Sequence, residues 1–467
     1  MDMLLIPINL MQINMRKIIS VVLLIIVAKG FAQKQKEEGI FKTEIPKQEF
    51  NIILGRPTSN AIDISIYAYQ NMEVQVVYGF KPNNLTFVSQ KKWMATQKME
   101  VVTLEHLEAG KRYYYQILYS KEGDTEKQKG ELHFFQTQRL PDQKFVFAIQ
   151  ADSHLDENTD PATYFQSLKN MGSDSVDFLI DLGDTWMTDK YRNDFTLSVK
   201  QYEAQRYYFS AIANQASLFH VLGNHDGESK PKGKNGNGSN IQEWSYKTRM
   251  SYYINPKENA FYSENSSSYY AWNWGSALFV VLDPFTYSSN GKDPWQRSLG
   301  KTQYDWLNNT LAKSKAKFKF VFIHNLVGGV DKKGIARGGV EAVPFWEWGG
   351  LDSSGVRTFE QNRAGWEMPI HSLFVKYNVN IVFHGHDHFF AKQEKDGIVY
   401  QLLPQPGAMH YGINKSVGEY GYKEGVILNA PGYLRVTLES NRCHVAYVQS
   451  SVNDKDNKKI LHTYELQ

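Results

Sequence analysis

The stretch from Phe145 to His154 reads FVFAIQADSH, and the prediction of the fold depends on it. Its first six residues form an apolar run, which is typical of a strand buried on both faces of a sheet. Asp152-Ser153-His154 follows at once, so a carboxylate and an imidazole stand just past the carboxyl end of this strand. Sheets built from alternating strands and helices form their ligand sites at this end. The stretch therefore predicts a core strand with functional side chains at its end.

The same pattern, an apolar strand followed by Asp, Asn or His, recurs toward the C-terminus. Further strands are predicted at 176–180, 218–222, 277–282, 318–323 and 380–383, with helices near 161–171 and 194–214. The polar residues after the strands are Gly183-Asp184, Gly223-Asn224-His225-Asp226, His324 and Gly385-His386-Asp387-His388. Strands that alternate with helices predict an α/β core with the helices outside.

The C-terminal part of the chain is predicted to be more antiparallel. Asp396-Gly397 stands between two apolar stretches, as in a tight hairpin turn. Two further strands are predicted at 433–438 and 444–448.

The residues before this core have a different pattern. Between 49 and 138, short runs alternate apolar and polar residues, most clearly at 61–67, 74–78 and 113–118. Such runs, separated by turn residues, predict a small all-β sandwich. The stretch Leu107–Tyr113 resembles the fibronectin type III pattern, in which a tyrosine closes a corner onto the backbone. Residues 33–48 are charged and poorly patterned, which predicts a linker.

The N-terminus predicts export. Arg16 and Lys17 precede an apolar run from Ile18 to Ala28, and Gly30-Phe31-Ala32 offers a small-x-small cleavage site. These are the parts of a Sec-type signal peptide at 1–32, whose start is Met1 or Met15. A run of this length is too short to span a bilayer, so no stable membrane anchor is expected after cleavage. The mature chain is expected to be periplasmic or extracellular.

Composition excludes several classes of protein. The chain has 467 residues, with 52 Lys and Arg against 49 Asp and Glu, so its net charge is +3. Charges so nearly balanced give no support for a strongly basic nucleic-acid binder, and no nucleic-acid-binding surface is evident. The lone Cys443 excludes an intramolecular disulfide and any multi-cysteine metal site. Aromatic residues make up 14% of the chain, which composition alone does not explain.

The residues at the strand ends suit metal ions. Imidazole, carboxylate and carboxamide ligands without thiolate favour Fe, Mn or Zn. Two such ions, with one carboxylate between them, can clamp a phosphoryl group and activate a water.

The order of these motifs resembles that of the calcineurin-like metallophosphoesterases, and the sandwich in front resembles the purple acid phosphatase branch. The resemblance implies a four-layer αββα sandwich over residues 144–467 and two metal ions. By the same resemblance, Asp152, His154 and His388 would hold one ion, Asp184 would bridge, and Asn224, His324 and His386 would hold the other. His225 would be the general acid, and Asp226 could fix its tautomer.

One position departs from the purple acid phosphatase pattern. Met187 stands in Gly183-Asp184-Thr185-Trp186-Met187 where that branch has its iron-binding tyrosine. A thioether is a poor ligand for ferric iron, and His154 can take the vacant place. We therefore expect a centre without a tyrosinate-to-iron absorption band.

The sequence indicates the residues that contact the substrate less clearly than it indicates the metal ligands. The long insertion from Gly328 to Pro369 contains Arg337 and Arg363, either of which could contact phosphate, and His410 could line the site. The leading hypothesis is an exported phosphomonoesterase acting on a small phosphoester. A phosphodiesterase or nucleotide hydrolase on the same site remains open, as does an inactive surface binding module. The sequence does not predict the oligomeric state.

Overall fold

A computed structural model of the chain describes residues 39–191, 193–228, 240–256, 268–288, 293–328, 337–412 and 415–467. The predicted signal peptide lies outside these ranges. Ile40–Gln467 form one compact unit. Among the helices within the described ranges, none has the length and apolar character that a bilayer span requires.

An all-β sandwich forms the first part of this unit. One sheet has the order β1-β2-β6, from Phe50–Gly55, Ile62–Ala68 and Lys98–Leu104. The other has the order β4-β3-β7-β8 with β5 also on β3, from Met72–Gly79 (β3), Phe87–Val88 (β4), Lys92–Met94 (β5), Arg112–Lys121 (β7) and Gln128–Gln136 (β8). The alternating runs of the sequence are confirmed as β2, β3 and β7.

The alternation in β3 and β7 has the expected cause, because only one face of their sheet is fully buried, whereas every residue of β2 is buried. In β3, Met72, Val74 and Val76 point into the core of the sandwich while their neighbours are half-buried. The Tyr113 hydroxyl accepts the backbone N–H of Glu108 at 2.9 Å, as a corner tyrosine does. The assignment to fibronectin type III stays a prediction.

Two larger sheets follow. The six-stranded sheet has the order β11-β10-β9-β19-β20-β21, from Phe145–Gln150 (β9), Phe178–Asp181 (β10), Ser217–His220 (β11), Gly432–Glu439 (β19), Arg442–Gln449 (β20) and Ile460–Leu466 (β21). The seven-stranded sheet has the order β12-β13-β14-β15-β17-β16-β18, from Tyr270–Trp274 (β12), Ala277–Val281 (β13), Phe318–Phe322 (β14), Ile381–His384 (β15), Phe390–Lys395 (β16), Ile398–Leu402 (β17) and Val426–Leu428 (β18). The strands β9, β10 and β11 are parallel, as are β13, β14, β15 and β17.

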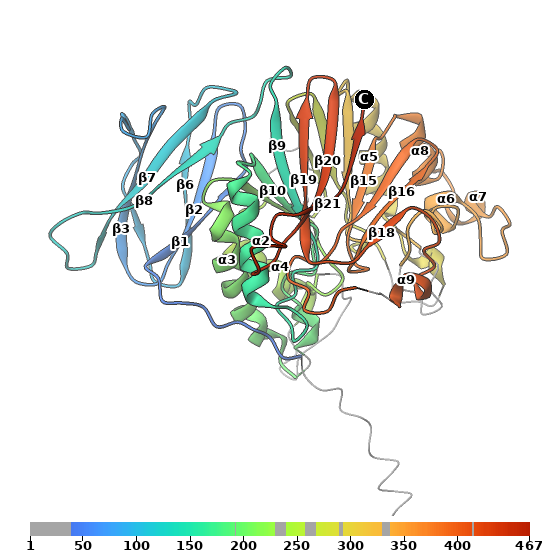
Figure 1. Ribbon diagram of the computed structural model, residues 1–467, viewed down its shortest axis with the longest axis horizontal. Coiled ribbons are helices and arrows are strands. Elements are labelled where there is room, and N and C mark those ends of the chain that lie inside the picture. Colours follow the sequence, from blue (N-terminus) through green and yellow to red (C-terminus); the bar gives the residue numbers. More distant parts are fainter. Residues whose placement is uncertain are drawn as a thin grey trace, which may run out of the picture. The chain divides into compact units, whose positions relative to one another are not determined.

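Helices cover the outer faces of these sheets (Figure 1). The larger ones are Pro161–Ser173 (α2), Val199–Ala213 (α3), Ile241–Tyr252 (α4) and Gly300–Lys313 (α5). The shorter ones are Trp346–Gly349 (α6), Phe359–Asn362 (α7), Ile370–Lys376 (α8) and Ser416–Glu419 (α9), with 3-10 turns Thr188–Lys190 (η1), Phe195–Ser198 (η2) and Pro294–Gln296 (η3). The predicted helix near 194–214 thus begins as a 3-10 turn and becomes α-helical at Val199.

Three apolar cores separate four layers. Phe147, Phe279 and Phe322 belong to the core between the two sheets. The six-stranded sheet packs on α2 and α3, and the seven-stranded sheet packs on α5 and α8. This confirms the αββα arrangement. The core between the two sheets is rich in phenylalanine, and this explains part of the high aromatic content of the chain.

The C-terminal strands behave as predicted. Asp396 and Gly397, both with positive φ, turn between β16 and β17, where Lys395 pairs with Ile398. The strand β19 pairs antiparallel with both β9 and β20. The last strand, β21, has no counterpart among the predicted strands.

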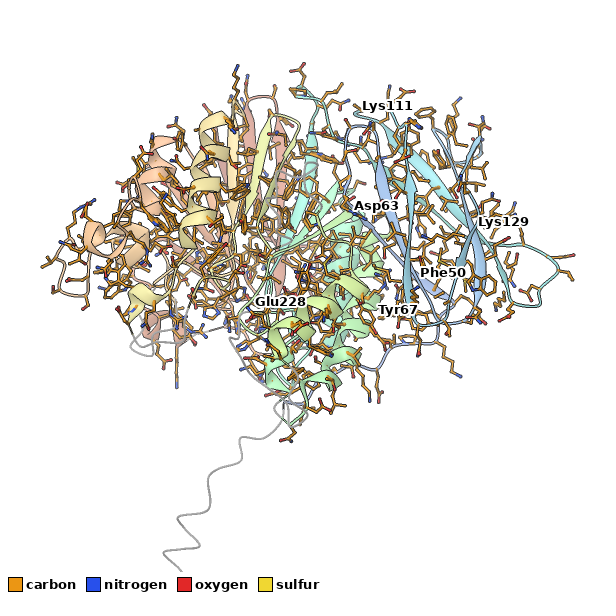
Figure 2. All side chains as sticks on the ribbon, turned by 180° about the vertical axis from the view of Figure 1, so that it is seen from behind. Phe50, Asp63, Tyr67, Lys111, Lys129 and Glu228 are labelled. Atoms are coloured by element: carbon orange, nitrogen blue, oxygen red, sulfur yellow. The ribbon has the colours of Figure 1, made fainter. Side chains whose placement is uncertain are left out.

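The sandwich and the α/β core share a buried polar contact. Arg206 on α3 is fully buried, and its guanidinium donates to Asn51 Oδ1 at 2.6 Å and to Ser65 Oγ at 2.8 Å. Nearby, the Tyr67 hydroxyl donates to Glu203 of α3 at 2.9 Å. Figure 2 shows Tyr67 at the end of its strand that approaches the helices. The sandwich is therefore packed against the core through specific hydrogen bonds.

Candidate metal centre

Parallel strands bring the predicted residues to one edge of the molecule's core. Asp152 follows β9, Asp184 follows β10 and Asn224 follows β11, and these three strands are neighbours in one sheet. His324 follows β14, and His386 follows the adjacent β15 of the other sheet. The carboxyl ends of both sheets thus meet where the ligand site was predicted.

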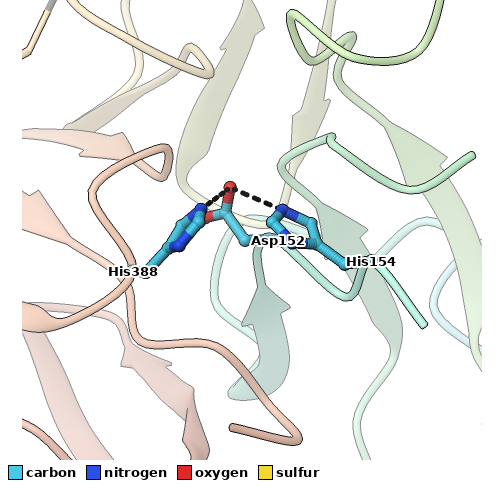
Figure 3. Close-up of side chains that lie close together, drawn as sticks. All are labelled: Asp152, His154 and His388. Atoms are coloured by element: carbon cyan, nitrogen blue, oxygen red, sulfur yellow. Dashed lines mark ion pairs between the residues drawn. The ribbon is translucent and has the colours of Figure 1, made fainter. Parts of the chain in front are cut away.

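Asp152, His154 and His388 form the first candidate group. The Nε2 atoms of His388 and His154 lie 3.5 and 3.8 Å from Asp152 Oδ1. Figure 3 shows both rings directed at the same carboxylate oxygen from opposite sides. Metal bonds of about 2.0–2.2 Å place two ligands on one ion roughly 3–3.5 Å apart. The group is therefore only slightly wider than a loaded site.

Asp184, His324 and His386 form the second candidate group. His324 Nε2 lies 3.3 Å from Asp184 Oδ2 and 3.1 Å from Asn224 Oδ1. The rings of His324 and His386 stand 5.1 Å apart. Asn224 thus lies beside this group and can add a carboxamide oxygen to it.

The two groups are in contact with each other. Asp184 Oδ2 lies 3.9 Å from His154 Nε2 of the first group, and Asp152 Oδ1 lies 3.9 Å from His324 Nε2 of the second. A carboxylate between two ions is what a di-metal site requires. Asp184 and Asp152 each lie close enough to the other group to serve as that carboxylate.

Several buried side-chain atoms of the two groups have no hydrogen-bond partner, as is expected of atoms that bind a metal ion. Asp152 Oδ1, His154 Nε2 and His386 Nε2 are buried and have no hydrogen-bond partner. Leaving such an atom unpaired costs about 1–3 kcal/mol. All three are atoms that a cation would bind, so the residues fit a metal centre.

Charge within the centre shifts the pKa values of its members. Burial opposes charge throughout, yet the imidazoles around Asp152, His388 foremost, hold the pKa of that carboxyl far below its usual range. Against the effect of burial, Asp152 raises the pKa of His154 to about 10, and Asp184 raises the pKa of His324 to about 9. A cation that binds here must displace protons from these rings.

Glycines allow the loops to approach one another. A Cβ atom at Gly223 would lie 2.0 Å from the backbone nitrogen of Asp184, and one at Gly385 would lie 2.8 Å from Asp152 Oδ2. Only glycine fits at such distances. The motifs Gly223-Asn224 and Gly385-His386 therefore have a packing reason as well as a chemical one.

The structure places His225 beside a different acid from the one predicted. His225 Nδ1 lies 2.9 Å from Asp189 Oδ1, and Asp189 belongs to η1. The hypothesis that Asp226 fixes this ring is wrong. Sequence reasoning missed Asp189, because only the fold of the turn after Asp184 brings it to the ring.

Asp226 instead holds the loops together. Its buried carboxylate accepts four backbone N–H groups at 2.7–3.1 Å, from Gly223, Asp184, Thr185 and Trp186. These donors belong to the loops after β10 and β11. Asp226 is thus a structural anchor for Asp184 and Asn224.

A second acid also escaped the sequence analysis. Asp156 Oδ2 lies 3.2 Å from His154 Nδ1, the ring nitrogen opposite the candidate ligand atom. Gln405 Nε2 lies 3.4 Å from the same nitrogen and donates to Asp152 O at 3.1 Å. A carboxylate behind a ligating histidine fixes the direction of its ring. The short spacing from His154 to Asp156 was the available signal.

Met187 is buried at the start of η1. His154, by contrast, belongs to the first candidate group. The first candidate group thus contains the imidazole that was expected to take the place of the tyrosine.

Arg363 does not match its predicted role. Its guanidinium pairs with the buried Glu347 and donates to the backbone oxygens of Trp295 at 2.7 Å and Arg297 at 3.0 Å. These bonds occupy the guanidinium N–H groups that would bind phosphate. The prediction that Arg363 contacts the substrate is therefore wrong.

Arg337 lies closer to the centre but also has partners. Its Nη1 donates to His386 O and to Asp387 Oδ1, each at 2.8 Å, and its guanidinium lies over the Tyr420 ring. Arg337 therefore braces the loop that carries His386. His410 is exposed, and its role stays a prediction.

Comparison with known proteins agrees with this geometry. The sequence model of the calcineurin-like phosphoesterases matches residues 145–390, more than half of the chain. The chain therefore belongs to the calcineurin-like phosphoesterase family, a family of di-metal phosphoric ester hydrolases. No curated protein matches its sequence.

Two solved structures share the fold over nearly the whole chain. Purple acid phosphatase PPD1 from yellow lupin (Lupinus luteus) seeds has 14% identity and a TM-score of 0.58, over 90% of this chain and 74% of that one. PhoD has 14% identity and a TM-score of 0.62, over 91% of this chain and 92% of that one. At this identity the likeness shows the fold alone.

Proposed function

We propose that the chain is an exported di-metal phosphomonoesterase. Asp152, His154 and His388 hold one ion, and Asn224, His324 and His386 hold the other, with Asp184 between them. Two bound cations would supply positive charge to the phosphoryl oxygens and lower the pKa of the attacking water. The observation that carries the proposal is the set of buried, unpartnered ligand atoms beside the His225–Asp189 pair.

The pairing with Asp189 defines the task of His225. An Asp at Nδ1 makes Nε2 the nitrogen that exchanges a proton, and it stabilises the charged ring. His225 Nε2 would then protonate the leaving oxygen of the ester. The backbone N–H of His225 donates to Asp184 Oδ1 at 2.7 Å, so the same residue is tied to the candidate bridging carboxylate.

Charge favours a monoester over a diester. The candidate ligand set contains two carboxylates, Asp152 and Asp184, beside neutral ligands. Two divalent cations would exceed that negative charge by about two. A phosphate monoester dianion balances this excess, whereas a diester carries a single negative charge.

Turnover of two aryl substrates tests the proposal. The zinc- or manganese-loaded chain should hydrolyse 4-nitrophenyl phosphate with a higher kcat/KM than bis(4-nitrophenyl) phosphate. His225→Ala should lower kcat for an alkyl phosphate by about 10²–10⁴-fold and for the nitrophenyl ester by much less, because nitrophenolate leaves without a proton. Preference for the diester would favour a phosphodiesterase, and no turnover of any phosphoester would favour a binding module.

Export is a separate part of the proposal. It is supported by the basic, apolar and small-x-small segments of residues 15–32. The N-terminus of the chain purified from the medium or periplasm of a Sec-competent bacterial host should begin at Gln33. A chain retained in the cytoplasm with its N-terminus intact would contradict it.

A further inference from the structure

The loop after β9 has a costly backbone conformation. Asp152, His154 and Leu155 have φ values of 58°, 38° and 54°. The left-handed region is unfavourable for non-glycine residues, because the Cβ atom comes too close to the following carbonyl oxygen. Such a loop keeps its shape only when surrounding contacts hold it. The same loop carries Asp156, which contacts the ring of His154, so its shape sets the direction of a candidate ligand.

A segment far away in the sequence supplies part of that support. We name residues 40–46 the N-terminal strap. Phe41 forms an antiparallel bridge with Asp156, and the Lys42 N–H donates to Leu155 O at 2.8 Å. The strap therefore pairs like a short strand with the strained part of the loop.

The side chain of Lys42 contacts the C-terminal part of the same loop. Its ammonium group donates to the backbone oxygen of Thr159 and lies 3.4 Å from that of Glu157. One residue of the strap thus contacts the loop at two places, through its backbone at Leu155 and through its side chain at Thr159.

Phe41 connects the loop to the segment of the general acid. Its ring stacks on Tyr191 with centroids 4.5 Å apart and an interplanar angle of 16°. Tyr191 ends the turn η1, which carries Asp189, the partner of His225. The strap therefore touches both the His154 loop and the turn that orients His225.

We propose that the N-terminal strap is a positioning element of the metal centre, in which Phe41 and Lys42 hold the His154–Asp156 loop and so set the metal affinity of the first group. The proposal rests on the proposed function, because it takes Asp152, His154 and His388 to hold an ion. Phe41 and Lys42 belong to the segment predicted to be a linker, and in this proposal they act on the centre without touching the metal.

Zinc titration against a chromophoric chelator measures this effect. A His386→Ala background removes a ligand of the second group, so the titration reports the first. In that background, combining Phe41→Ala with Lys42→Ala should weaken zinc binding by about 10–100-fold, the usual cost of losing outer contacts of a site. The single change Lys42→Arg, which keeps a cationic donor at this position, should keep most of the zinc affinity. Lys47→Ala, an exposed residue just beyond the strap, should leave it unchanged.

A double-mutant cycle tests the route of the effect. Because the strap acts through Asp156, the strap variants should cost much less affinity once Asp156→Ala is present. Full additivity of the two losses would overturn the proposal. So would wild-type affinity in the strap variants, or a loss of affinity matched by an equal loss in the second group, measured in a His388→Ala background. If the unaltered chain binds no zinc at all, the proposed function itself fails.

Discussion

His225 has one ring nitrogen paired with the Asp189 carboxylate, and its backbone N–H is bonded to the candidate metal ligand Asp184. Asp189 lies at Nδ1, and the backbone N–H of His225 donates to Asp184. The ring is therefore fixed in direction by one contact and in position by the other. At the scale of single residues, the chemistry depends on such partners as much as on the groups that react.

Asp189→Asn should reduce general acid catalysis. An amide at this position no longer stabilises the charged ring and can favour the wrong tautomer, so kcat for an alkyl phosphate should fall about 10²-fold or more. The loss for 4-nitrophenyl phosphate should be much smaller. Asp305→Asn on the exposed face of α5 is the matched control. Equal losses on both substrates would show that Asp189 acts on something other than the leaving group.

Metal binding should release protons. In the metal-free chain the pKa of His154 is about 10 and that of His324 about 9, both raised above the ordinary value, so both rings are charged at pH 7.5. A metal needs the neutral ring, so its affinity should rise with pH through pH 9–10. Proton release can be measured in weak buffer during zinc titration. His154→Ala should release one proton fewer, and binding without any proton release would contradict the assignment.

At the scale of secondary-structure elements, the positions where strands end decide which side chains meet in the candidate site. The parallel strands β9, β10 and β11 stop beside one another, and glycines let the loops that follow cross at close range. Asp226 then ties the loops after β10 and β11 together through backbone N–H groups. The position of Asp184 is therefore set by two neighbouring strands.

Gly223→Ala should disrupt the second group. The added Cβ would lie 2.0 Å from Asp184 N and 2.3 Å from its Oδ1, so the loop that carries Asp184 must move. We expect zinc affinity at the second group to fall about 100-fold, the upper end for outer-contact losses. Gly418→Ala, with open space around it, should behave as wild type. Unchanged zinc affinity in Gly223→Ala would contradict the proposed packing.

At the scale of the whole molecule, the sandwich is held to the α/β core by buried polar contacts. Arg206 donates to Asn51 on β1 and to Ser65 on β2, and Tyr67 on β2 donates to Glu203 on α3. The bonds of Arg206 are buried, and that of Tyr67 is partly buried. The sandwich is therefore expected to unfold together with the core.

Arg206→Ala should destabilise the chain strongly. It leaves the acceptors on Asn51 and Ser65 and the backbone oxygen of Tyr252 without their donor, at about 1–3 kcal/mol each. The free energy of unfolding in urea should fall by about 3 kcal/mol or more. Arg357→Ala, which removes an exposed pair, should change it by less than about 0.5 kcal/mol. Similar small effects of both variants would show that the junction is not structurally important.

Sequence alone could predict what is local in the chain. An apolar strand and the acid or histidine that ends it stand in one short string, so β9 with Asp152 and β15 with His386 and His388 were found. The partner of a side chain depends on how separate loops pack. For this reason Asp189 and Asp156 were missed, Asp226 was given the wrong task, and Arg363 was taken for a substrate contact.

The same distinction applies to residues 39–48, the described part of the predicted linker. Their charged, irregular pattern is typical of a linker, because an irregular segment that is held by backbone pairing has no periodicity to read. Only the structure shows that Phe41 and Lys42 pair with a loop more than a hundred residues away. Packing of distant segments is the information that a single sequence lacks.

The central claim is that two groups of residues hold two metal ions in one centre. The most direct test is the number of zinc ions bound per chain at equilibrium, measured by elemental analysis on the unaltered protein, His388→Ala and His386→Ala. The account predicts two ions for the unaltered chain and one for each variant, with phosphoester hydrolysis lost in both. An unaltered chain that binds fewer than two ions, or variants that keep both, would contradict it.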